Sequence, residues 1–167
     1  LVVHAETQSE LEGTDEQTDR AESWCRLMRI PFMRRTAGSL ERCLLGLEAA
    51  RESGYTVSIP AFTTGDGMLK RQCTPHYKVH VIHQAPREFL GLGHGERAPK
   101  DLRVRSLQGI SVEEADRMKP SRVPWVENTS PLVDARVARW DCEDWLKQRG
   151  LPIPPKSSCV FCPYHGD

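Results

Sequence analysis

Apolar residues alternate between strand-like and helical spacing, and this pattern predicts an α/β fold. Leu1–Ala5 is an apolar run typical of a buried strand. Apolar positions then recur on one helical face over 21–28, after Thr14 and Gln17, which form a capping-box pattern. A short strand is expected at 30–33.

The middle of the chain continues this alternation. A helical pattern over 40–47 precedes a β-branched strand at 55–60. Thr74 is a candidate N-cap with Pro75 in the first helical position. We expect the helix that follows to be bent or divided at Pro86.

The last third is less regular. Alternation over 102–110 predicts a half-buried strand. Ser111 and Glu114 form a second capping-box pattern, which opens a short helix at 112–118. A longer helical pattern runs from 133 to 150 and leads into a proline-rich approach to Cys159.

Strands that alternate with helices imply an α/β domain with a largely parallel sheet flanked by helices. We expect this domain to occupy residues 1–132, with a small helical, cysteine-rich C-terminal subdomain over 133–167 packed on it. The chain opens inside a strand at Leu1 and stops soon after Cys162. We therefore expect a fragment that is truncated at both ends.

Composition narrows the class of protein. The 23 Lys and Arg residues equal the 23 Asp and Glu residues, so no basic excess makes duplex nucleic acid the default partner. No apolar run approaches the length of a membrane helix, and no leader pattern is present. We expect a cytoplasmic protein without membrane association, and its six cysteines then favour reduced thiols or metal ligands.

The firmest candidate ligands are Cys159 and Cys162, a CxxC pair that can bind one metal ion or one cluster iron from a tight turn. The alternative is two small buried apolar residues. Cys73, at a predicted helix start, is a candidate ligand, nucleophile or neighbour of an anion site, and Cys142, between two tryptophans, is a candidate for a further ligand. A place in the core explains Cys142 almost as well.

Spacing alone leaves the metal open. Four thiolates suit either tetrahedral Zn²⁺ or a [4Fe–4S] cluster, and His165 is a candidate to replace one thiol in a Cys3His zinc site. Cys25 and Cys43 fall on apolar helical faces, which favours a place in the core.

A set of cations is a candidate anion site. Arg71 precedes a predicted helix N-terminus, Lys78 lies about one turn further on, and Arg122 ends a basic segment. Guanidinium groups bind phosphate or sulfate with two hydrogen bonds, but solvated surface charges explain each cation equally well. The chain has no GxSxG, HExxH or GxxxxGK[ST] motif and no GxGxxG after a strand.

Several segments in order resemble one known family. They are Leu1–Thr7, 65–78 with Arg-Gln-Cys-Thr and Tyr-Lys, 109–122, Asp141–Cys142, and 156–165 with Cys-Val-Phe-Cys-Pro-Tyr-His. Together they are similar to the phosphoadenosine phosphosulfate (PAPS) reductase family. More narrowly, the chain resembles the uncharacterised bacterial and phage branch that carries RQCT…YK and CVFCPYH.

The resemblance implies an adenine nucleotide alpha-hydrolase-like, Rossmann-like fold, with the nucleotide over the carboxyl ends of the strands. Glu6 and Thr7 would then border the adenosine of ATP, adenosine phosphosulfate (APS) or PAPS. Arg71 and Lys78 would face its phosphate or sulfate, in the cation set that includes Arg122. The ligands of the family's iron–sulfur cluster would correspond to four cysteines: Cys73, Cys142, Cys159 and Cys162.

Two family features are absent from the sequence: the SGGxDS pyrophosphate loop before the first strand and a C-terminal ECGxH-type catalytic motif. The leading hypothesis is a fragment of a PAPS reductase-like oxidoreductase that works with a thiol reductant. One alternative is an ATP-dependent adenylating or sulfur-transfer enzyme that acts on another acceptor, such as a nucleic-acid base. The other is a zinc-stabilised, non-catalytic binding module.

Overall fold

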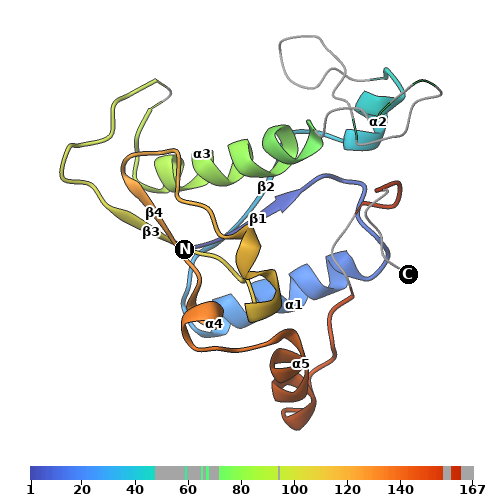
Figure 1. Ribbon diagram of the computed structural model, residues 1–167. Helices are drawn as coiled ribbons and strands as arrows, with labels where there is room; N and C mark the ends of the chain where they lie inside the picture. The colour runs from blue at the N-terminus through green and yellow to red at the C-terminus, as the bar shows by residue number, and fades with distance from the viewer. Residues whose placement is uncertain are drawn as a thin grey trace. The chain divides into compact units, whose positions relative to one another are not determined.

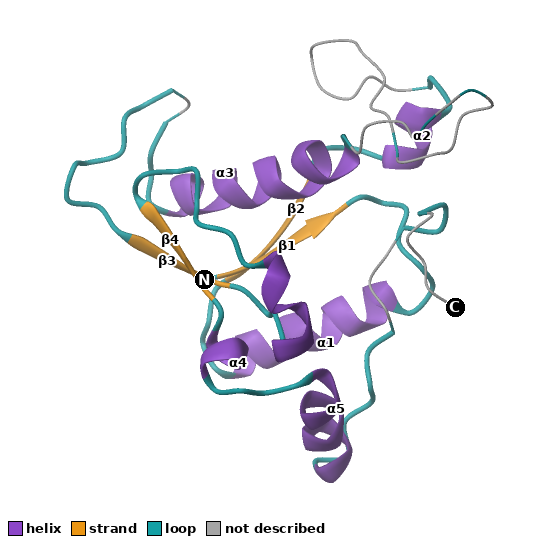
Figure 2. Ribbon diagram, in the orientation of Figure 1, coloured by secondary structure: helices purple, strands orange, loops and turns teal. Residues whose placement is uncertain are grey.

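The computed structural model describes most of the chain, namely residues 1–47, 59, 65, 67, 72–93, 95–155 and 159–162. It is a mixed α/β structure with helices and two small parallel sheets of two strands each (Figures 1 and 2). Of the strand predicted at 55–60, Ile59 alone is among the described residues, so the strand itself stays a prediction. The chain divides into two compact units, Leu1–Gly93 with Pro154–Asp167 and His94–Ile153, which are described in turn. The boundary predicted at residue 132 is a different division and stays a prediction.

The first unit is built around a β–α–β arrangement. Its elements are β1 (Val2–Glu6), α1 (Thr14–Leu27), β2 (Phe32–Thr36), α2 (Leu40–Leu44), the π-helical segment η1 (Thr74–Val79) and α3 (His80–Phe89). β1 pairs with β2 in parallel, from Val2 opposite Phe32 to Glu6 opposite Thr36. A parallel pair needs a crossover, which α1 provides. α1 packs against β2, and α3 packs against both strands from the other side (Figure 1).

The second unit also contains a parallel pair. Its elements are β3 (Val104–Leu107), the 3₁₀ segment η2 (Val112–Arg117), β4 (Val126–Thr129), α4 (Pro131–Asp134) and α5 (Arg139–Gln148) (Figure 2). β3 and β4 run parallel, with Val104 opposite Val126, and η2 lies in the crossover between them. The predicted strand at 102–110 and short helix at 112–118 are thus both present, although the helix is 3₁₀.

The predicted capping boxes do not form. α1 starts from Gly13, whose φ of 85° is left-handed, so Thr14 is already inside the helix and caps nothing. Thr14 Oγ1 and Gln17 Oε1 are buried without a hydrogen-bond partner in the described part of the chain. The N-cap of η1 is Cys73 rather than the predicted Thr74, and again no side chain caps the first turn. Ser111 precedes η2 but makes no capping bond either.

The single helix predicted over 133–150 is wrong, because the chain breaks between α4 and α5. Arg136 adopts a left-handed φ of 56°, and Ala138 is extended. Carboxylates then satisfy the free N–H groups that start α5: Asp141 Oδ2 accepts from Ala138 N at 2.8 Å, and Glu113 accepts from Arg139 N at 3.0 Å. Pro86, in contrast, lies inside α3 and does not divide it.

None of the helices in the described part of the chain combines the length and apolar character needed to cross a membrane.

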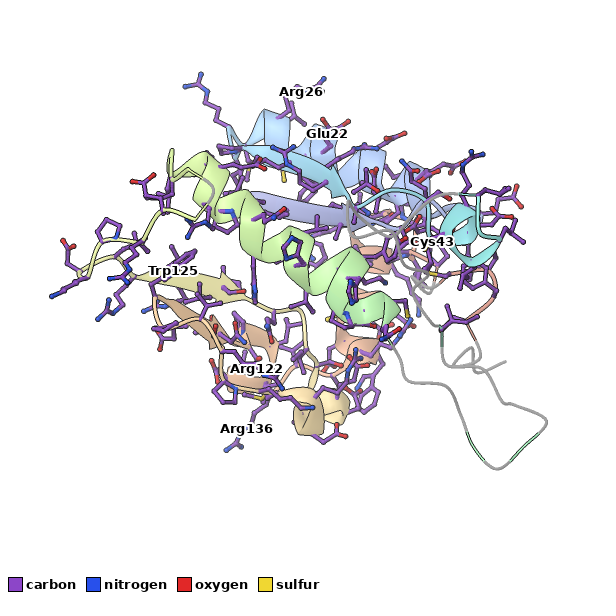
Figure 3. All side chains as sticks on the ribbon, turned by 90° about the horizontal axis from the view of Figure 1, so that it is seen from above. Glu22, Arg26, Cys43, Arg122, Trp125 and Arg136 are labelled. Carbon is purple, nitrogen blue, oxygen red and sulfur yellow. The ribbon has the colours of Figure 1, made fainter. Side chains whose placement is uncertain are left out.

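Arg34 on β2 joins both strands of the first unit to α1. Its guanidinium bonds to Glu22 at 2.9 Å and to Asp19 at 2.5 Å, and it pairs with Glu6 of β1 at 3.7 Å. Glu22 also pairs with Arg26 on the same helix at 3.9 Å (Figure 3). One cation therefore balances three carboxylates that come from two elements.

Replacing Arg34 by Met should lower the free energy of unfolding by about 1–2 kcal/mol, because it leaves three neighbouring carboxylates without their shared cation. Urea unfolding measures this change. Arg20→Met is the matched control, since Arg20 makes one exposed pair with Glu16 at 3.4 Å, and it should cost less than about 0.5 kcal/mol. Equal losses in the two variants would show that the network adds nothing.

Candidate functional site

The loop that follows β1 is closed by one carboxylate. Glu10 Oε1 accepts the backbone N–H of Thr7 at 2.6 Å and its hydroxyl at 2.7 Å, and Oε2 accepts the N–H of Ser9 at 3.0 Å. Thr7 and Ser9 are buried, at 1% and 7% exposure, so water cannot readily replace these bonds. The loop is thereby held at the carboxyl end of β1.

The CxxC turn from the C-terminal end of the chain lies against this loop. Glu10 and Cys159 form an isolated antiparallel bridge, and Val160 N donates to Ser9 O at 2.9 Å. The turn itself is closed by Cys162 N, which donates to Cys159 O at 3.0 Å. Cys159 Sγ lies 3.3 Å from Thr7 Oγ1, so the thiol faces the end of β1.

The start of α2 is tied to the same loop. Leu40 N donates to Thr7 O at 2.9 Å, and Glu41 N donates to Ser9 Oγ at 3.1 Å. Ser39 is the N-cap of α2 and accepts from Arg42 N through its side chain at 3.3 Å. The loop therefore supplies acceptors that the first turn of α2 needs.

A small buried cluster of Leu40, Cys43 and Tyr77 lies beneath these segments (Figure 3 labels Cys43 on α2). Tyr77 belongs to η1, whose N-cap is Cys73. Cys73 and Cys159 are partly buried and both pack against the cluster. Two of the four predicted ligands thus lie on one core, while Cys43 has the core position predicted for it.

The charges around Cys159 act in opposite directions. Burial raises the pKa of the Cys159 thiol, and electrostatic interactions with Glu10 and Cys73 add to this effect, whereas the hydrogen bond with Thr7 and the ammonium of Lys78 oppose it. Burial alone would raise the pKa of Glu10 as well, but its hydrogen bonds from Thr7 and Ser9 outweigh burial and lower that pKa. Glu10 is therefore an ionised acceptor beside a protonated thiol at neutral pH.

This ionisation sets the direction of the hydrogen bonds. An ionised carboxylate can only accept hydrogen bonds, so the single O–H of Thr7 is the donor to Glu10. Thr7 Oγ1 then accepts from the Cys159 S–H at 3.3 Å. The three side chains form a chain of hydrogen bonds in which the thiol donates to the hydroxyl and the hydroxyl donates to the carboxylate.

The other predicted site residues lie in different places. Glu6 ends β1, and Lys78 lies in η1 near enough to act on the Cys159 thiol. Arg71 lies outside the described residues, as does His165. Cys142, on α5, and Arg122, which is exposed (Figure 3), belong to the second unit.

The six cysteines are thiols that take part in no disulfide, and Cys159 and Cys162 are partly buried. Among the described residues, no three Cys, His, Asp or Glu side chains are grouped so that they could hold a metal ion. The four-cysteine ligand set stays a prediction.

Sequence reasoning missed Glu10 and Ser9. Thr7 and Glu10 have the T-x-x-E spacing of a capping box, and Glu10 does accept the Thr7 N–H as the acidic residue of such a box does. No helix starts at Thr7, so the same local geometry here closes a loop. That spacing directly after a strand was the available signal.

Comparisons with protein-family models, with curated proteins and with solved structures found no match to this chain.

Removing the Leu40 side chain tests whether the cluster supports the site. Leu40→Ala should lower the free energy of unfolding by about 2–4 kcal/mol, because Leu40 is only 1% exposed and leaves a cavity against Cys43 and Tyr77. Leu45→Ala is the control at a residue that is 65% exposed, and it should cost less than about 0.5 kcal/mol. Chemical denaturation of both variants measures the difference, and similar losses would contradict a core role for Leu40.

Proposed function

We propose that this chain is part of a PAPS reductase-like enzyme that binds an adenine (sulfo)nucleotide and holds an iron–sulfur cluster through Cys73, Cys142, Cys159 and Cys162. One observation carries the proposal. The loop after β1 contacts the Cys159 turn, and both Lys78 and Cys73 lie close enough to influence the same thiol. Thr7 and Lys78, which we expect to contact nucleotide, thus lie near Cys73 and Cys159, which we expect to bind metal.

The nucleotide part of the proposal follows from the position of the loop. In open α/β sheets, ligands bind beyond the carboxyl ends of parallel strands. Thr7 follows the carboxyl end of β1, and β2 runs parallel beside it. We place β1 and β2 in a Rossmann-like, adenine nucleotide alpha-hydrolase-like sheet, where Glu6 and Thr7 border the adenosine and Lys78 faces the phosphate or sulfate.

The donor set fits the proposed cluster in its chemistry. All four cysteines are thiols outside any disulfide and are partly exposed, and thiolate sulfur is the usual ligand of cluster iron. An iron–sulfur cluster bound there would supply electron-transfer chemistry beside the nucleotide. The chain's own contribution is to orient Cys159 through Thr7 and to bring the cation of Lys78 to the same place.

Anaerobic reconstitution with ferrous iron and sulfide tests the cluster. The chain should take up about four iron atoms with visible absorbance, because four thiolates suit a [4Fe–4S] centre. Serine at each of the four proposed ligand positions should abolish this uptake, whereas Cys25→Ser on α1 is the matched control and should retain it. Stoichiometric zinc without iron would contradict the cluster and favour a zinc-stabilised module.

Binding of APS and PAPS tests the nucleotide site. Lys78→Ala should weaken binding about tenfold, because an ammonium that pairs with phosphate or sulfate contributes on the order of 1–2 kcal/mol. Lys100→Ala, at an exposed lysine, should leave the dissociation constant unchanged. Isothermal titration calorimetry provides the measurement.

Identical affinities for wild type and Lys78→Ala would contradict the assignment of Lys78. In assays with a thiol reductant, release of sulfite supports the reductase. Release of AMP or pyrophosphate from ATP would instead favour the adenylating alternative.

A further inference from the structure

Glu10 lies at the centre of the contacts that hold Cys159 against the loop after β1. Its carboxylate accepts the N–H and hydroxyl of Thr7 and the N–H of Ser9, at 2.6, 2.7 and 3.0 Å. Its backbone forms the bridge to Cys159. One side chain therefore satisfies three donors of the loop and contacts the thiol through the hydroxyl of Thr7.

We infer that Glu10 is a positioning residue for the Cys159 sulfur, and that it acts through Thr7. Because Glu10 accepts the hydrogen bond of the Thr7 hydroxyl, the lone pairs of Oγ1 are left to accept from the thiol. By accepting a hydrogen bond from the N–H of Ser9, it holds the residue whose carbonyl accepts from Val160 N. The interpretation of the positioned sulfur as a metal ligand rests on the proposed function, whereas the contacts themselves do not.

Charge and acceptor number make Glu10 hard to replace by a neutral side chain. A glutamine of the same size keeps one oxygen, but its NH₂ group has no lone pair and would confront a second N–H donor. Because Thr7 and Ser9 are almost fully buried, water cannot readily take over the lost bonds. The loop and the CxxC turn should then separate more often, which exposes Cys159 to reagents.

Two residues of the same unit serve as controls. Glu12 is an exposed carboxylate two positions further on, so Glu12→Gln makes the same chemical change outside the network. Cys25, a partly buried thiol on α1, reports unfolding of the unit as a whole.

Alkylation of the metal-free chain by iodoacetamide, followed at each cysteine by mass spectrometry, tests the inference. Glu10→Gln and Thr7→Val should each raise the rate at Cys159 about tenfold, because each removes a buried hydrogen bond that holds the turn. The rate at Cys25 should not change. Thr7→Ser keeps the hydroxyl and should behave as wild type, as should Glu12→Gln.

The double variant separates positioning from general loosening. If Glu10 acts through Thr7, Glu10→Gln combined with Thr7→Val should be no faster at Cys159 than the faster single variant. The inference is overturned if the two single-variant accelerations at Cys159 multiply in the double variant. It is also overturned if no variant accelerates alkylation at Cys159, or if Cys25 is accelerated equally. If Glu10→Gln does not fold, the comparison of Thr7→Val with Thr7→Ser decides the test. Equal alkylation rates at Cys159 in those two variants would overturn the inference.

The same variants distinguish this inference from the proposed function. Suppose that the Glu10 and Thr7 variants are alkylated faster at Cys159 alone, while wild type binds neither iron nor adenine nucleotide. The proposed function is then rejected and the positioning role stands. Iron uptake by wild type without selective alkylation would do the reverse.

Discussion

The site depends on how a buried loop satisfies its own polar groups. The chain leaves β1 into a segment that no sheet or helix ladder pairs, and buried N–H groups without acceptors are costly. Glu10 supplies the acceptors for Thr7 and Ser9 from within the loop. Because these donors are satisfied internally, the loop's own carbonyls are free to bind α2 and the CxxC turn.

The site is built from segments that are far apart in sequence. The loop after β1, the start of α2, η1 and the turn at 159–162 meet on the cluster of Leu40, Cys43 and Tyr77. The CxxC turn is held by its bridge to Glu10 and by packing on that cluster, not by an element of its own. Its geometry therefore depends on tertiary contacts, and weakening the cluster should loosen the thiols.

Periodicity was a good guide to elements and a poor guide to their ends. The apolar pattern gave β1, α1 and β3 close to their observed positions, because one buried face per element sets the spacing of apolar residues. It extended one helix across 133–150, since the apolar spacing continues where Arg136 turns left-handed. A non-glycine residue with positive φ carries no signal in hydrophobic pattern.

The candidate site was predictable in part. The cysteines and Lys78 stand out in the sequence by residue type and by motif spacing. The partners of these residues did not stand out, because the contact between Glu10 and the Cys159 turn joins positions separated by most of the chain. Sequence spacing predicts local contacts, whereas this one depends on how distant elements pack.

The capping-box spacing shows why local signals need tertiary context. Ser111 and Glu114 have it, yet Glu114 pairs with Arg117 and the neighbouring Glu113 carboxylate instead receives the N–H of Arg139 at the start of α5. Thr7 and Glu10 have it too, and there the reciprocal bond forms without any helix. A Ser or Thr three residues before an acid thus marks a candidate acceptor, and the donor that its carboxylate binds depends on the segment that follows and on tertiary contacts. The residues directly after Thr7 are polar, so the Glu10 carboxylate closes a loop there instead of a helix. The Thr7 hydroxyl can then also accept a hydrogen bond from the Cys159 thiol.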